Sequence, residues 1–337
     1  MRGAVAIGML VAATTAAAAG PLPKAPPAST EPKLPAGVTL DPVSVPAGPG
    51  FKPRAAKWWK KKKPCPPGAK LEKVVNEPKR IAAEKWAKAF VCRDADGKDH
   101  GPGVAVFDNN KPYEDSWSEH GKNHGTRYTW SRDGKMVHVQ TFVDDLQHGP
   151  EAEWSGGVMI RSGQYKDDKQ YGLWTYEYPT GLVLRGYSLD GGDAVGTWIG
   201  TRPGVATAII VEEHSTGPGG TYRVFDTAGQ LTFERRIDAT GGVATAYLEG
   251  VRIADYDCGL DGAIGESRFY DDEGLLQRRW NDRTQTLTDR AGATLATTED
   301  QAKQLRGVRD ACTGSLWILE GSPPSRHSAF GKPPPPR

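Results

Sequence analysis

Residues His148–Tyr178 read HGPEAEWSGGVMIRSGQYKDDKQYGLWTYEY, and this stretch decides the fold. Its last five residues, Trp174–Tyr178, alternate aromatic with polar side chains. This period of two predicts a strand with an aromatic face. The glycine pair Gly156-Gly157 supplies the positive φ angles that a hairpin turn needs. The stretch therefore predicts a β-hairpin, an acidic turn at Asp167-Asp168, and the first strand of a second hairpin.

The same unit recurs along the chain about every 24 residues. Three residue classes keep the spacing: a glycine that opens each unit, a glycine in the mid-unit turn, and an aromatic residue that closes the first strand. In that order they are Gly101, Gly125, Gly149, Gly172, Gly196, Gly220 and Gly265; Gly134, Gly157, Gly181, Gly204, Gly229 and Gly274; and Phe107, Trp130, Trp154, Tyr178, Phe225 and Tyr270. Such a period is typical of repeat architectures. A lone hairpin is marginal in water, so successive hairpins are expected to stack.

The sequence thus predicts an all-β protein, an elongated antiparallel meander of stacked β-hairpin repeats of 23–24 residues over 100–290. The pattern decays over 193–265, where Arg202 replaces the closing aromatic residue. We expect either degenerate units or a functional irregularity there.

Short helical segments are expected at both ends of the array. Residues 65–99 read as a cysteine-bounded helical N-cap, because apolar residues recur at roughly helical spacing between Ile81 and Val91. Residues 291–320 read as a helical C-cap that begins with a capping box at Thr298 and shields the last sheet edge.

The termini have a different composition. Residues 1–19 combine one arginine, a short apolar run and a row of alanines, the pattern of a secretory signal peptide cleaved near Ala19. A retained weak anchor or a disordered leader is the alternative. Residues 20–64 hold eleven prolines and predict a disordered or polyproline-like linker, and 321–337 predict a disordered proline-rich tail. The chain is therefore expected to be exported: periplasmic, in the cell envelope or secreted.

The four cysteines are an even number in a chain expected to be exported, which favours two disulfides. Three pairings are open. Cys65–Cys92 and Cys258–Cys312 are favoured, because each pair brackets one expected helix. Free buried thiols are the alternative.

Units such as His148–Trp154 and Tyr171–Tyr176 resemble MORN repeats, most closely the bacterial variant of antitoxin-like proteins. The resemblance covers 100–190 well and 220–280 loosely. It implies an elongated meander of hairpins that acts in scaffolding or binding, with no catalytic residues to carry over. The antitoxin role fits an exported chain badly, because an antitoxin acts in the cytoplasm.

Two groups of residues are candidate binding sites. The cluster Lys57–Lys63 places five lysines around Trp58 and Trp59, so Trp58, Trp59, Lys60, Lys61, Lys62 and Lys63 could contact an anionic surface. The alternative is a linker whose tryptophan pair docks on the domain. The aromatic residues Trp130, Trp154 and Tyr178 are expected to line a concave sheet face.

His100, His124 and His148 are expected to stack along one edge of the sheet. They could bind a metal, but we favour turn residues that the repeat places there. The acidic turns Asp144-Asp145 and Asp167-Asp168 lack the ligand spacing of a calcium loop and read as solvated turns. No metal or other cofactor is assigned.

No nucleophile elbow, phosphate loop or metalloprotease helix occurs in the sequence. We therefore expect a non-enzymatic exported scaffold that binds a protein or cell-envelope partner. An anionic lipid or polysaccharide surface-binding module is the second hypothesis, and a metal-dependent hydrolase is a distant third. The net charge of +2 gives no global field for nucleic acid, and export disfavours such a partner.

Overall fold

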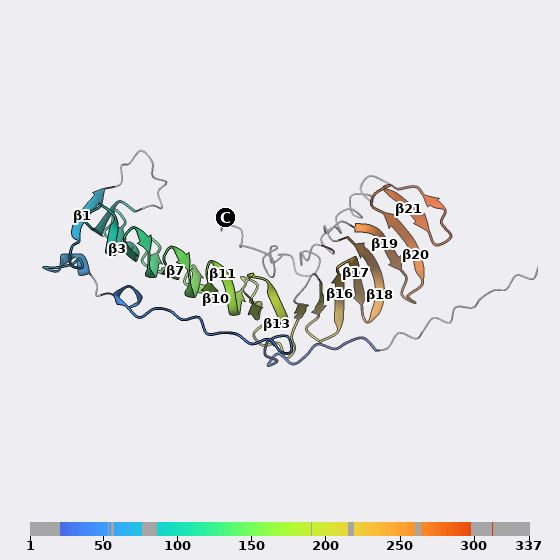
Figure 1. Ribbon diagram of the computed structural model, residues 1–337. Coiled ribbons are helices and arrows are strands. Elements are labelled where there is room, and N and C mark those ends of the chain that lie inside the picture. The colour runs from blue at the N-terminus through green and yellow to red at the C-terminus, as the bar shows by residue number, and fades with distance from the viewer. Residues whose placement is uncertain are drawn as a thin grey trace, which may run out of the picture.

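The computed structural model describes residues 21–52, 54, 57–75, 86–189, 191–214, 219–259, 264–297 and 312. They form one open antiparallel sheet of 22 strands, in which each hairpin pairs with the next along the chain. The sheet is long, twisted and curved (Figure 1). The prediction of an all-β meander of hairpins is confirmed.

The strands are β1 (Lys70–Val75), β2 (Lys88–Arg93), β3 (Asp99–Val106), β4 (Pro112–Glu119), β5 (Lys122–Asn123), β6 (Gly125–Trp130), β7 (Met136–Val143), β8 (Leu146–Gln147), β9 (Gly149–Ser155), β10 (Val158–Lys166), β11 (Lys169–Glu177), β12 (Val183–Ser188), β13 (Ala194–Thr201), β14 (Ile210–His214), β15 (Gly220–Phe225), β16 (Leu231–Asp238), β17 (Gly241–Leu248), β18 (Val251–Cys258), β19 (Ile264–Tyr270), β20 (Leu276–Asn281), β21 (Thr286–Asp289) and β22 (Thr294–Leu295). Two 3₁₀ helices, η1 (Pro49–Phe51) and η2 (Trp58–Lys60), precede the sheet.

The expected helical N-cap is wrong where the structure describes it. Phe90 and Val91, which were expected in a helix, lie in β2, and β1 pairs with β2 as the first hairpin. Residues 76–85 lie outside the described part, as do the expected signal peptide and the proline-rich tail. Of the expected helical C-cap, residues 291–297 and Cys312 are described: Thr294–Leu295 form the strand β22, so the prediction is wrong there, and Cys312 is helical.

Both favoured disulfides are present. Cys65 is bonded to Cys92, and Cys258 is bonded to Cys312. The first ties the residues before β1 to β2. The second ties Cys312 to the end of β18, where both cysteines belong to the main apolar core. The disulfide prediction is therefore confirmed.

The region with the weakest repeat pattern holds much of this core. Strands β13 to β18 pair in regular antiparallel order across 194–258. Aliphatic residues such as Ile210 and Val224 pair across these strands and are buried. The loss of the aromatic period therefore reflects a change of core residues and leaves the sheet continuous.

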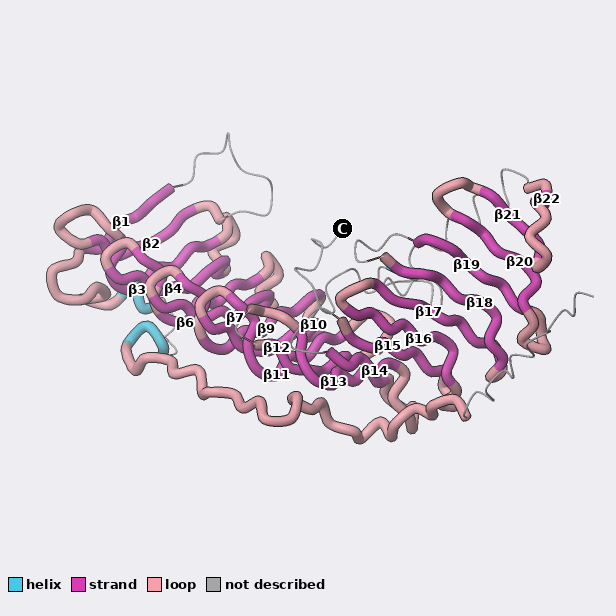
Figure 2. Tube along the Cα trace, turned by 45° about the vertical axis from the view of Figure 1, so that its right-hand side comes forward, coloured by secondary structure: helices cyan, strands magenta, loops and turns pink. Residues whose placement is uncertain are grey.

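The expected disordered linker instead packs along the sheet. We call the described residues between 21 and 59 the N-terminal strap. The strap runs along the outer side of the curved sheet for most of its length (Figures 1 and 2). Its apolar residues Leu22 and Ala25 pack against a cluster that includes Ile199 and Val211, and Trp58 packs at the other end of the array. The prediction of disorder is therefore wrong for these residues.

The strap runs in the opposite direction to the array. As its residue numbers rise, those of its partners generally fall. In chain order the pairs are Lys24 with Gln230, Pro27 with Thr207, Glu31 with Arg185, Asp41 with Tyr171 and Arg54 with Asp115, and Trp58 shares an apolar cluster with Val104. Proline fixes φ and favours extended backbone, so a proline-rich segment loses little conformational freedom when it lies along a sheet.

The strap explains some of the glycines that open the repeat units. A Cβ on Gly125, whose φ is +111°, would lie 2.4 Å from the carbonyl oxygen of Gly50 in the strap. A Cβ on Gly149 would lie 2.7 Å from Val45 in the strap. At these positions glycine is required both for its backbone conformation and for close contact with the strap.

Candidate functional site

The three aromatic residues expected on one face lie on two. In a strand, adjacent residues point to opposite faces, so Trp154 lies opposite to its neighbour Glu153. Glu153 pairs directly with a residue of β10, and that residue pairs directly with Tyr176 of β11. Glu153 and Tyr176 therefore lie on the same face of the sheet. Tyr178, two residues after Tyr176, therefore shares the face of Glu153 and not that of Trp154.

A difference in hairpin length causes this switch. Thr129 pairs with His138, nine residues further along the chain, whereas Glu153 in the next unit pairs with Arg161, eight residues further along. A difference of one residue moves the side chains that follow to the other face of a strand. The spacing of the aromatic residues does not reveal this difference, and the expectation of a single aromatic face was therefore wrong.

Trp130 and Trp154 share a face and form an apolar ridge. Trp130 is paired with Met136 across one mid-unit turn, and Trp154 is paired with Met159 across the next. Both tryptophans are half-buried. Met159 is 38% exposed. We call Trp130, Met136, Trp154 and Met159 the Trp–Met ridge.

The tryptophans of the Lys/Trp cluster pack against other residues of the protein. Trp58 is buried with Cys92 and Val104, and Trp59 stacks on Phe90 with ring centroids 5.9 Å apart. The structure thus agrees with the alternative interpretation, in which the tryptophan pair docks on the domain. Lys57 and the four residues Lys60–Lys63 remain exposed.

The histidines at the unit boundaries bind neighbouring turns. The Nδ1 atoms of His124 and His148 lie 3.5 Å from Asp144 and 3.0 Å from Asp167. The ring of His100 stacks on that of His120 at 4.3 Å. Each of these histidines therefore contacts the turn about 20 residues further along the chain. This supports the interpretation that they are structural residues of the turns between units.

The acidic turns link successive units. Asp144 and Asp145 both have positive φ, as do Asp167 and Asp168. This geometry is typical of the two-residue turns that match the twist of a hairpin. An Oδ1 atom of Asp145 accepts the backbone N–H of Asn123 at 2.7 Å, and Asp168 repeats this contact with the next unit. The carboxylates therefore satisfy backbone donors.

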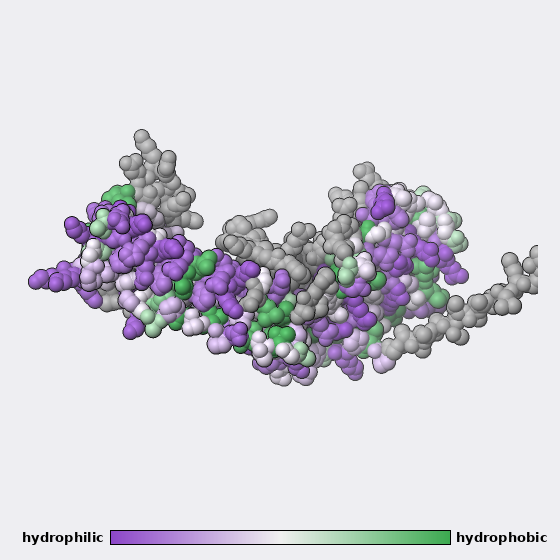
Figure 3. Space-filling view, in the orientation of Figure 1, coloured by the Kyte–Doolittle hydropathy of each residue, from purple (hydrophilic) through white to green (hydrophobic). Residues whose placement is uncertain are grey.

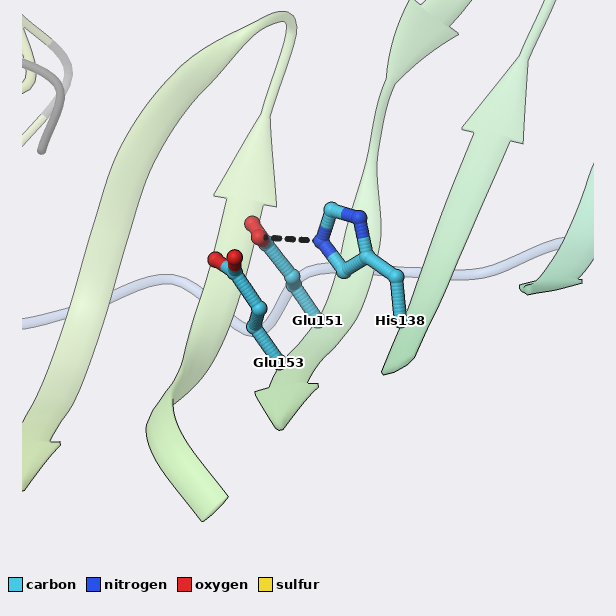
Figure 4. Close-up of side chains that lie close together, drawn as sticks. All are labelled: His138, Glu151 and Glu153. Atoms are coloured by element: carbon cyan, nitrogen blue, oxygen red, sulfur yellow. Dashed lines mark hydrogen bonds and ion pairs between the residues drawn. The ribbon is translucent and has the colours of Figure 1, made fainter. Parts of the chain in front are cut away.

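A polar cluster that sequence reasoning missed lies on the face of Tyr176. The Nε2 atom of His138 lies 2.7 Å from the carboxylate of Glu151, which is fully buried (Figure 4). Glu153 points toward the same place, and ligand atoms of these three residues lie within 4.8 Å of one another. The donor types would suit a transition metal.

Arg161 already supplies a cation to this cluster. Its guanidinium lies 2.7 Å from Glu151 and 2.7 Å from Glu153. Gln147 donates a further hydrogen bond to Glu151 at 2.9 Å. Burial alone would lower the pKa of Arg161, but the two carboxylates outweigh it and raise the pKa above its ordinary value. We interpret the cluster as a buried ion-pair network.

Only the strand register could have identified this cluster. His138 pairs directly with Glu153, and Glu153 pairs directly with Arg161. The three residues come from β7, β9 and β10, and their sequence spacing matches no known motif. Burial together with Glu151 raises the pKa of the neighbouring Tyr165 to about 12.

A second buried carboxylate occurs in the C-terminal half. Asp255 is almost fully buried and is paired with Arg252. It also accepts hydrogen bonds from Thr245 at 2.9 Å and Tyr270 at 2.9 Å. Charge buried within this sheet is therefore matched by an opposite charge or by several donors.

No protein-family model matches the chain, and no curated protein sequence matches it. In the part of the chain that the structure describes, no helix has the length and apolar character needed to cross a membrane.

Proposed function

We propose that the chain is an exported, non-enzymatic scaffold of MORN-like hairpin units that binds a protein or cell-envelope partner through the Trp–Met ridge. The observation that carries this proposal is the two cross-strand pairs Trp130–Met136 and Trp154–Met159 on one face, with Met159 exposed to solvent. Half-buried tryptophans are frequent anchors of protein interfaces. Methionine adapts its shape to a partner surface.

The architecture supports a scaffold. The sheet is one continuous array, so residues of successive units stand at regular intervals along an extended surface. Two disulfides are typical of proteins in oxidising compartments, which supports export.

The ionisable groups support a non-enzymatic role. The buried carboxylates of Glu151 and Asp255 are each paired with arginine and further donors. A group held in this way is less suited to exchange protons with a substrate than an unpaired group in a cleft.

A photo-crosslinking amino acid at residue 154 tests the proposal in cells that produce the protein naturally. We expect one discrete adduct at position 154 and again at position 130, with the same partner identified by mass spectrometry. A crosslinker at Lys122, which is exposed at the other edge of the array, serves as the control.

Equal adducts at all three positions, or none at 130 and 154, would contradict the proposal. A Met159→Ser variant separates the ridge from the general surface. It should weaken recovery of the identified partner with the melting temperature unchanged, because Met159 is exposed.

A further inference from the structure

The densest positive charge in the chain lies in one exposed loop. Lys57 and Lys60–Lys63 together carry +5, whereas the whole chain has a net charge of +2, so the remainder is net negative. Within the described residues, no ion pair involves these five lysines. The loop precedes β1 at one end of the molecule, where hydrophilic side chains cover the surface (Figures 1 and 3).

The sheet holds this loop in a defined conformation. Trp58 is buried, and Trp59 stacks on Phe90. The backbone of Lys60 donates to Lys57, and that of Lys61 donates to Trp58, which closes the 3₁₀ helix η2. The disulfide of Cys65 fixes the other end of the loop. The lysines are thus presented with little loss of conformational entropy on binding.

Exposed aliphatic residues adjoin the lysines. Leu71, Lys73 and Val75 alternate along β1 and therefore lie on one face. Lys73 pairs with Phe90, the residue on which Trp59 stacks, so this face is that of the lysine loop. Leu71 is 37% exposed and Val75 is 62% exposed.

We propose that the lysine loop and β1 together bind the surface of an anionic phospholipid bilayer. Lysines attract the charged headgroups, and the aliphatic side chains enter the apolar boundary below them. A soluble polyanion offers no apolar phase for Leu71 and Val75, which favours the bilayer. This site lies outside the Trp–Met ridge and does not depend on it.

Vesicle co-sedimentation of the full-length exported protein tests the proposal. We expect binding to vesicles of equimolar phosphatidylglycerol and phosphatidylcholine that weakens as salt rises, and no binding to phosphatidylcholine alone. Each lysine near an anionic surface contributes roughly fivefold to the partition coefficient. The double variant K61Q/K62Q should therefore bind about 25-fold more weakly.

Matched variants make the result specific. Lys122→Gln with Lys169→Gln removes the same charge from exposed positions elsewhere and should leave binding unchanged. Val75→Ser should weaken binding severalfold, whereas Val243→Ser, at another exposed valine, should not. Circular dichroism checks that every variant is folded.

Three results would overturn the proposal. One is an equal loss of binding in the loop variant and its charge-matched control. The second is full binding by Val75→Ser together with complete competition by a soluble polyanion, which would indicate a polyanion site. The third is no difference between the two vesicle compositions.

Discussion

The carboxylate of Asp145 accepts a hydrogen bond from the backbone N–H of Asn123, which lies 22 residues earlier in the chain, at 2.7 Å. The backbone N–H of Asp145 in turn donates to the carbonyl of Asn123 at 2.9 Å. One aspartate at a turn thus pairs with both the backbone N–H and the backbone carbonyl of one residue in the preceding unit. Asp168 does the same for Gln147. The acidic turns therefore hold neighbouring hairpins in register at this edge of the sheet.

We expect Asp145→Ala to lower the free energy of unfolding by about 1–2 kcal/mol, because it removes an acceptor and places alanine at positive φ. Asp145→Asn keeps an acceptor oxygen and tolerates this backbone conformation, so its loss should be well below that of alanine. Urea unfolding of both variants provides the measurement. Equal losses would contradict a role for the side-chain acceptor.

Gly125→Ala should weaken docking of the strap, because its Cβ would meet the backbone of Gly50 at 2.4 Å. Gly134→Ala is the matched control, since Gly134 also has positive φ but only Lys111 nearby, at 3.7 Å. Both carry the strain of positive φ, about 1–2 kcal/mol. Only Gly125→Ala should speed proteolytic cleavage within the strap. The same cleavage rate in both variants would show that the strap does not depend on this contact.

Arg161→Met should destabilise the protein by about 3–5 kcal/mol, because it leaves the fully buried Glu151 without its main countercharge. The double variant with Glu151→Gln should recover part of this loss, since the uncompensated charge is then gone. A double-mutant cycle from thermal or urea unfolding measures the coupling. Additive losses would contradict the interpretation as an ion-pair network.

The two disulfides should contribute differently to stability. Cys65 and Cys92 are 27 residues apart, and Cys258 and Cys312 are 54 apart. Loop-closure entropy predicts losses of about 3.5 and about 4 kcal/mol when each pair is replaced by serine. Unfolding under non-reducing conditions compares the two double variants. A clearly larger loss for the shorter loop would contradict an entropic origin.

Stability should fall as pH rises from about 10 to 12. Burial raises the pKa of Tyr256 to about 12, and burial with the nearby Glu151 does the same for Tyr165. In this range the folded state keeps protons that the unfolded chain, with an ordinary tyrosine pKa, has lost, so unfolding becomes easier as pH rises. Unfolding curves across this range should show the decline. Tyr165→Phe with Tyr256→Phe should make the decline less steep, and an unchanged slope would contradict the assignment.

The periodic glycine and aromatic residues predicted the meander because each unit repeats the same turn chemistry. The cysteine pairing was also predictable, although Phe90 and Val91 proved to lie in a strand. The period of the aromatic residues could not reveal that the hairpin of β9 and β10 is one residue shorter than that of β6 and β7, which places Tyr178 and Trp154 on opposite faces. The cluster of Glu151 was equally hidden, because its members meet only through the register of three strands.

The strap escaped prediction for a different reason. Its apolar residues have no period of their own, because their positions are set by the surface on which they lie. The corresponding signal is in the array, where the opening glycines Gly125 and Gly149 leave space for a second chain segment. A glycine repeated at the start of each hairpin can therefore indicate a crossing segment as well as a turn.

The reversed course of the strap sets the order in which its partners are synthesised. Sequence separation between partners rises from 61 residues at Arg54–Asp115 to 130 at Asp41–Tyr171 and 154 at Glu31–Arg185. The part of the strap that is synthesised first therefore meets its partners last, because those partners lie furthest along the chain. During synthesis the partners of the strap become available from Trp58 outward, as each further hairpin is completed. The length of the strap thus matches the number of hairpins. In an array with one hairpin fewer or more, the strap residues beyond the change would no longer meet their partners.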